Sequence, residues 1–279
     1  MVYKEFLITA EPFNPDILSG FLWNLDITGI SEEVNCLKIF SESVTKNEIE
    51  ILCNKLVEDK ILFSFTVEEN FIEERNWNEE WENSRDVIRI TDRIVVKPTF
   101  RNYSALENEI VITVDPKMSF GTGEHQTTKL MITLAEKYIK YGMKVLDAGT
   151  GTGILAIAAV KLGASNVTAF DVDEWCLENS RENVELNDVS ENIKLKICTI
   201  KEIEENEFDL IFANIQKNVL IEISSEIASR IKENGILLLS GILHIDELDI
   251  LQHYNNTGFR LLEKRQADEW LALSLCKKY

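Results

Sequence analysis

Several features that mark particular protein classes are scarce in this chain of 279 residues. It contains only 4 prolines and 12 glycines, which excludes collagen-like repetition and wholesale disorder. Its five cysteines are odd in number, widely spread and without a C-x-x-C pair, so the sequence carries no zinc or redox motif of that type. This usage is typical of free thiols in a reducing cytosol. We expect no metal site.

Long apolar runs are also missing. One of the longer runs, residues 154–160, is far shorter than the ~18 residues that indicate a membrane span. The N-terminus lacks the basic start and apolar stretch of a signal peptide. We therefore expect a soluble, cytoplasmic protein that does not enter a membrane.

Basic residues are fewer than acidic ones: the chain has 29 Lys and Arg and 48 Asp and Glu, which gives a net charge of −19. An acidic surface repels phosphate backbones, so we expect no direct grip on nucleic acid. The acidity is concentrated at the front, where residues 1–60 carry 11 acidic and 5 basic residues and residues 68–86 carry 8 and 2. Front-domain acids such as Glu32, Glu33 and Glu48 could attract a basic partner. The alternative, that these charges only keep the protein soluble, stays open.

Apolar spacing predicts a small first domain over residues 1–68. The expected strands are 2–8, 28–34, 36–40 and 61–67, and the expected helices are 15–26 and 48–58. This βαββαβ order fits a ferredoxin-like α+β sandwich. Residues 69–85 are expected to form an acidic linker helix with Trp77 and Trp81 on one face, although both tryptophans could simply pack on a domain.

Residues 86–279 are expected to form a second, α/β domain. The predicted strands are 144–148, 167–171, 193–198, 208–213, 236–239, 259–263 and 271–276. From residue 145 onward these runs alternate with helical segments, which is typical of a Rossmann-like, doubly wound parallel sheet.

The strongest chemical signal is D-A-G-T-G-T-G at residues 147–153, between a predicted strand and the predicted helix 154–161. Glycines there permit a tight turn and close approach of a ligand. A dinucleotide fingerprint starting at Gly149 needs glycine where Ile154 stands, which disfavours a nicotinamide dehydrogenase. Asp171 lies 22 residues after Gly149, at the end of the next strand, where a carboxylate can bind two ribose hydroxyls. The alternative is that Asp171 and Asp173 only cap the following helix.

This glycine segment resembles motif I of class I methyltransferases, which bind S-adenosylmethionine. Two more segments sharpen the likeness, D-P-K-M-S-F-G-T-G-E-H-Q-T-T at 115–128 and F-D-L-I-F-A-N-I at 208–215. With L-S-G-I-L at 239–243 and E-W at 269–270, they closely resemble the signatures of the bacterial ribosomal protein L11 methyltransferase family (PrmA). The resemblance covers nearly all of residues 71–279, and the acidic front domain matches in size and place.

The resemblance implies an S-adenosylmethionine-dependent protein-lysine N-methyltransferase. Its substrate would be ribosomal protein L11, a basic protein, modified on lysine side chains, the N-terminal amine or both. Residues 1–68 would recognise this substrate and residues 86–279 would bind the cofactor. The implied cofactor contacts are Thr128, Gly149, Gly151, Asp171 and Asn214.

Besides Asp171, two of these residues have alternative interpretations. The hydroxyl of Thr128 could instead cap the helix that begins near it. Asn214 could be a loop asparagine whose hydrogen bonds are all satisfied within the protein. Residues 214–217, N-I-Q-K, lack the Pro-Pro-aromatic sequence of adenine and glutamine methyltransferases, which disfavours a flat amide or base substrate.

Methyl transfer to nitrogen needs a neutral amine lone pair aligned behind the methyl group, so positioning is expected to matter most. Asn214 could orient the amine by accepting its hydrogen bond. His125 is the only histidine near a motif, and a loop-structuring role is its favoured alternative to catalysis. Two other functions stay open: a small-molecule methyltransferase of the same fold, and a non-catalytic acidic binding module. We expect a monomer.

Overall fold

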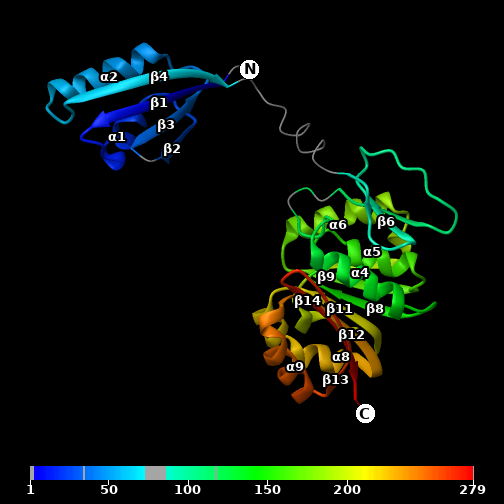
Figure 1. The fold of residues 1–279 in the computed structure, drawn as a ribbon. Coiled ribbons are helices and arrows are strands. Elements are labelled where there is room, and N and C mark those ends of the chain that lie inside the picture. The colour runs from blue at the N-terminus through cyan, green and yellow to red at the C-terminus, as the bar shows by residue number, and fades with distance from the viewer. Residues whose placement is uncertain (1–2, 34, 73–85, 116, 118, 279) are drawn as a thin grey trace. The chain divides into compact units, whose positions relative to one another are not determined.

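The computed structural model describes residues 3–33, 35–72, 86–115, 117 and 119–278. The chain divides into two compact units, Met1–Ser84 and Arg85–Tyr279, and each is considered separately (Figure 1). Within the described residues, no helix combines the length and the apolar character needed to cross a membrane.

The first unit is an antiparallel four-stranded sheet with two helices, as predicted. Its elements are β1 (Tyr3–Glu11), α1 (Pro15–Leu22), β2 (Gly29–Glu33), β3 (Cys36–Ser41), α2 (Lys46–Glu58) and β4 (Ser64–Ile72). The strand order β2-β3-β1-β4 is that of a split βαβ, ferredoxin-like sandwich. Phe6, Ile39 and Ile49 are completely buried in its core.

Two boundaries in this unit differ from the sequence prediction. Helix α1 ends at Leu22 rather than at 26, because the Asn24 side-chain amide donates to the carbonyl of Phe21 at 2.9 Å and ends the last turn. Strand β4 runs to Ile72, because the nine residues of β1 pair with it over their full length. Residues 69–72 are therefore strand and not linker helix. The rest of the predicted linker helix, with its two tryptophans, lies outside the described residues.

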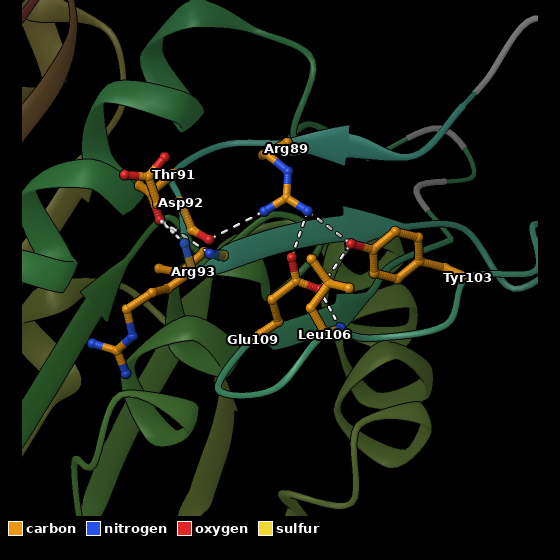
Figure 2. A network of polar contacts seen from close by, with 8 residues as sticks. Arg89, Thr91, Asp92, Arg93, Tyr103, Leu106 and Glu109 are labelled. Carbon is orange, nitrogen blue, oxygen red and sulfur yellow. Dashed lines mark hydrogen bonds and ion pairs between the residues drawn. The ribbon is translucent and has the colours of Figure 1, made fainter.

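The second unit begins with a three-stranded sheet of β5 (Ile88–Arg89), β6 (Ile94–Lys97) and β7 (Ile110–Thr113). The long loop between β6 and β7 is held down by Glu109, whose side chain is only 3% exposed. Figure 2 shows its carboxylate accepting from the Arg89 guanidinium (2.5 Å), the Tyr103 hydroxyl (2.8 Å) and the Leu106 N–H (2.7 Å). These donors lower the pKa of Glu109, the Leu106 N–H most strongly.

The main body of this unit is a seven-stranded sheet. Its strands are β8 (Lys144–Ala148), β9 (Asn166–Asp171), β10 (Ile193–Ile197), β11 (Phe208–Asn214), β12 (Ile231–Leu243), β13 (Phe259–Ala267) and β14 (Trp270–Lys277). Their order is β10-β9-β8-β11-β12-β14-β13. The first five are parallel, whereas β14 runs antiparallel to both of its neighbours.

Helices cover both faces of this sheet (Figure 1). One apolar cluster includes residues of α4 (Gln126–Tyr138), α5 (Ile154–Lys161) and α6 (Glu174–Leu186). The other includes residues of α7 (Lys217–Glu222), α8 (Ser224–Arg230) and α9 (Glu247–Asn256). The predicted doubly wound, Rossmann-like domain is confirmed. Its strand order reverses between β8 and β11, the point where open α/β sheets bind ligands beyond the carboxyl ends of their strands.

Candidate functional site

A cavity of about 740 Å³ opens at this reversal point, beyond the carboxyl ends of β8, β9 and β11. Its volume is in the range of sites that bury a small organic ligand. The structure brings all six residues singled out from the sequence to this one cavity: Thr128, Gly149, Gly151, Asp171, Asn214 and His125. They come from four separate segments of the chain.

The turn after β8 forms the floor of the cavity and requires its glycines. Gly149, Gly151 and Gly153 have φ angles of +74°, +56° and +83°, which side-chain-bearing residues rarely adopt. A Cβ on Gly149 would lie 2.5 Å from the Ile215 side chain, and one on Gly151 would collide with the carbonyl oxygen of Phe120. The glycines thus allow both the turn and its tight packing.

The backbone of this turn is already fully hydrogen-bonded on its N–H side. Gly149 and Thr150 donate to Phe170 O, Gly151 to Asp171 Oδ2, Thr152 to Phe120 O and Gly153 to Thr150 O, at 2.9–3.0 Å. The turn is therefore preorganised, and it leaves none of these five N–H groups free to bind a pyrophosphate. This agrees with the absence of a dinucleotide fingerprint.

Asp171 ends β9 and faces the turn. One carboxylate oxygen accepts from the Gly151 N–H (3.0 Å) and the other from the Asp173 N–H (3.2 Å). The N-cap of α6 is Asp173, which accepts from the Trp175 N–H at 2.9 Å. Capping therefore explains Asp173 and does not explain Asp171, whose partly buried carboxylate lines the cavity.

Thr128 does not cap its helix, contrary to one reading of the sequence. The N-cap of α4 is His125, whose Nδ1 accepts from the Thr127 N–H at 3.3 Å, and Thr128 lies inside the first turn. The Thr128 Oγ1 is buried without a hydrogen-bond partner, and so is the Asn214 Oδ1. The alternative of a fully satisfied Asn214 is therefore wrong. Two orphaned oxygens in one cavity are what a bound polar ligand would satisfy.

His125 also belongs to an aromatic wall. Its ring meets Phe120 and Trp270 edge-on, with ring centroids 5.2 and 4.8 Å away. Its Nδ1 lies 2.8 Å from the Thr127 hydroxyl as well as near the Thr127 N–H, so this ring nitrogen is engaged at the start of α4. The sequence patterns contained both aromatic residues, but their packing on His125 could only be seen in the fold.

Several ionisable groups lie in and below the cavity. Asp171 and Glu222 line it, and so do the basic residues Lys201 and His125. Beneath the turn, the completely buried Asp147 accepts from the Thr150 hydroxyl at 2.6 Å. Burial, and secondarily the charge of Asp171, raise the pKa of Asp147 to about 7. No cluster of three or more potential metal ligands occurs among the described residues.

The chain is similar to known proteins over most of its length. The family model described as Ribosomal protein L11 methyltransferase (PrmA) matches residues 21–278. A Ribosomal protein L11 methyltransferase of Acetivibrio thermocellus is 39% identical over 204 residues, which are 73% of this chain and 65% of that protein. Another, of Thermoanaerobacter pseudethanolicus, is 34% identical over 264 residues, covering 92% and 85%. The match to the first of these spans slightly less than two thirds of the relative's length.

Solved structures agree with this similarity. A ribosomal protein L11 methylase of Lactobacillus delbrueckii subsp. bulgaricus superposes with a TM-score of 0.66 at 32% identity, covering 70% of this chain and all of that one. A precorrin-6y C5,15-methyltransferase of Geobacter metallireducens shares the fold alone, with a TM-score of 0.50 at 15% identity.

Proposed function

The chain belongs to the ribosomal protein L11 methyltransferase (PrmA) family, and we propose that it is an S-adenosylmethionine-dependent protein N-methyltransferase. Its proposed substrate is ribosomal protein L11, methylated on lysine side chains, on the N-terminal amine or on both. The observation that carries this proposal is the single cavity in which a half-buried carboxylate and two orphaned oxygens surround a preorganised glycine turn.

The residues present fit S-adenosylmethionine, which supplies a methyl group on a sulfonium sulfur. Asp171 would accept hydrogen bonds from the ribose hydroxyls with the lone pairs that Gly151 and Asp173 leave free. Thr128 Oγ1 would gain the hydrogen-bond partner that it lacks in the protein. Gly149 and Gly151 would hold the turn against the ligand, since both line the cavity.

Asn214 is the proposed positioning group for the substrate amine. Its unpartnered Oδ1 can accept a hydrogen bond from a neutral amine and so direct the lone pair, without taking up the proton. His125 is proposed to structure the start of α4 rather than to act as a base, because its Nδ1 is engaged by Thr127. The amine would have to be neutral before the transfer, and the proposed contribution of the protein is its orientation.

The first unit is proposed to recognise the protein substrate, since its surface carries exposed acids such as Glu32, Glu33 and Glu48 and the substrate is basic. We also propose that the protein acts as a monomer in the cytoplasm, where its proposed substrate is made. The five cysteines are all free, which is compatible with a reducing compartment.

Binding measurements test the cofactor assignment. Isothermal titration calorimetry should show saturable, one-site binding of S-adenosylmethionine, and none of NAD at the same concentration. Binding of neither would support the cofactor-free module. Binding of S-adenosylmethionine with methyl transfer to small amines, but none to ribosomal protein L11, would support the small-molecule enzyme.

A further inference from the structure

Three buried asparagines follow one another from the middle of α6 to its C-cap. Asn179 and Asn183 lie in the helix and Asn187 is its C-cap, each four residues after the last, and they are 3%, 0% and 6% exposed. Buried amides are costly unless they are hydrogen-bonded. Here they bind the backbone of the segment that leaves β7, at Thr113 and Asp115.

Asn187 and Asn183 each bind both the N–H and the C=O of one residue of this segment, as a neighbouring β-strand would. Asn187 accepts from the Thr113 N–H (2.9 Å) and donates to the carbonyls of Thr113 (2.6 Å) and Asn183 (2.8 Å). Asn183 accepts from the Asp115 N–H (2.9 Å) and donates to the Asp115 carbonyl (3.3 Å). Asn179 donates to the same carbonyl at 2.8 Å.

Asn183 makes one contact of a different kind. Its amide also donates to the carbonyl of Thr152 at 2.9 Å, and Thr152 is part of the glycine turn. The adjacent Ser180 hydroxyl lies 2.6 Å from the carbonyl of Gly151. Helix α6 thus binds two successive carbonyls on the back of the turn.

The peptide groups of the turn contact the cavity lining through their N–H groups. The Thr152–Gly153 peptide, whose carbonyl accepts from Asn183, donates its N–H to Thr150 O, and the Gly151–Thr152 peptide, whose carbonyl accepts from Ser180, donates its N–H to Phe120 O. The Thr152 hydroxyl donates to Gly121 O at 2.7 Å. Phe120 and Gly121 line the cavity, whereas Asn183 does not. The side-chain amide of Asn183, on α6, therefore hydrogen-bonds both to the segment after β7 and to the turn. It does so from outside the cavity.

We propose that Asn183 is a positioning residue for cofactor binding, acting through Thr152 and Asp115. It needs one acceptor and two donors in a compact side chain, which asparagine supplies. This inference rests on the proposed use of S-adenosylmethionine at the cavity. Asn187 makes as many hydrogen bonds but reaches only Thr113 and its own helix, so its contribution is structural.

The test compares Asn183→Ala with Asn187→Ala, a control at the C-cap of α6 that is matched in residue type, burial and number of hydrogen bonds. Both variants should lower Tm by similar amounts. The Asn183→Ala variant should weaken S-adenosylmethionine binding and raise its KM by roughly tenfold, with a smaller change in kcat, because a buried carbonyl of the turn loses its partner. Asn187→Ala should leave affinity and KM within about twofold of the wild type.

Amide hydrogen exchange without cofactor gives an independent readout. The amides of residues 151–153 should exchange faster in Asn183→Ala than in Asn187→Ala. If the alanine variant does not fold, Asn183→Ser, which retains a polar group, takes its place with the same expectations.

Equal affinity losses in the two variants, or unchanged exchange at the turn in Asn183→Ala, would overturn the inference. A wild type that fails to bind S-adenosylmethionine would instead overturn the proposed function and, with it, the positioning role. The two failures are therefore distinguishable.

Discussion

Replacing Asp171 by alanine should weaken S-adenosylmethionine binding while leaving the protein folded. In the structure this carboxylate accepts from the Gly151 N–H at 3.0 Å and lines the cavity beside the glycine turn. Its removal would leave that N–H and the ligand's ribose hydroxyls without their acceptor. The perturbation thus acts on the turn and on the ligand together.

The expected magnitude follows from the cost of unpaired polar groups. Each buried group that loses its hydrogen-bond partner costs about 1–3 kcal/mol. Since about 1.4 kcal/mol corresponds to a factor of ten, one such group in the bound state weakens binding by roughly 5- to 150-fold. The Gly151 N–H is unpaired in the free variant too, so its loss reduces stability more than affinity.

Calorimetric titration of S-adenosylmethionine measures this effect, and Asp173→Ala is the matched control. Asp173 lies two residues further on and caps α6 through the Trp175 N–H, without lining the cavity. Its replacement should cost about 1 kcal/mol of folding free energy and leave the affinity unchanged. Unchanged affinity in Asp171→Ala, or an equal loss in Asp173→Ala, would refute the assignment of Asp171 to the ribose.

Three further outcomes are expected. The pKa of Asp147 is raised to about 7 from an ordinary 3.8, so the folded state keeps a proton that the unfolded chain loses, and the contribution of Asp147 to stability should fall as pH rises from about 4 to 7. Urea titrations at several pH values measure the free energy of unfolding, and Asp147→Asn should remove this contribution to its pH dependence. The same pH dependence in the variant and the wild type would contradict the prediction. A chain starting at Asp86 should bind S-adenosylmethionine but lose methylation of ribosomal protein L11, and methylation at the wild-type rate would argue against recognition by the first unit. The kcat/KM for this substrate should fall with added salt, and replacing Glu32, Glu33 and Glu48 by glutamine should flatten that fall without changing cofactor affinity. If kcat/KM changes neither with salt nor with these substitutions, electrostatic steering of the protein substrate by the first unit is excluded.

The sequence predicted the strands of the main sheet within a few residues, because each is an apolar run bounded by turns. The largest error was in β12, which spans Ile231–Leu243 rather than 236–239. Its first residue, the buried Ile231, pairs with Phe208 of β11, and the polar residues 232–234 lie in the irregularity before pairing resumes at Ile236. Pairing with a distant strand is not visible in a local pattern.

The cavity residues were predictable because motifs at the ends of parallel strands converge on one edge of a sheet. The N-cap of α4 was not, since both Thr128 and His125 have side chains able to cap, and the path of the chain into the helix decides between them. The role of Asn183 was also hidden. Its partners, Asp115 and Thr152, lie 68 and 31 residues away in the chain.

Mass spectrometry of intact ribosomal protein L11 tests the central claim most directly. Ribosomal protein L11 is incubated with this chain and S-adenosylmethionine, and parallel reactions omit either the chain or the cofactor. The product is then fragmented to locate the modification. The account predicts mass increases in whole methyl steps, confined to lysine side chains or the N-terminal amine and present only in the complete reaction. An unmodified substrate, under conditions in which calorimetry shows that the cofactor binds, would contradict it.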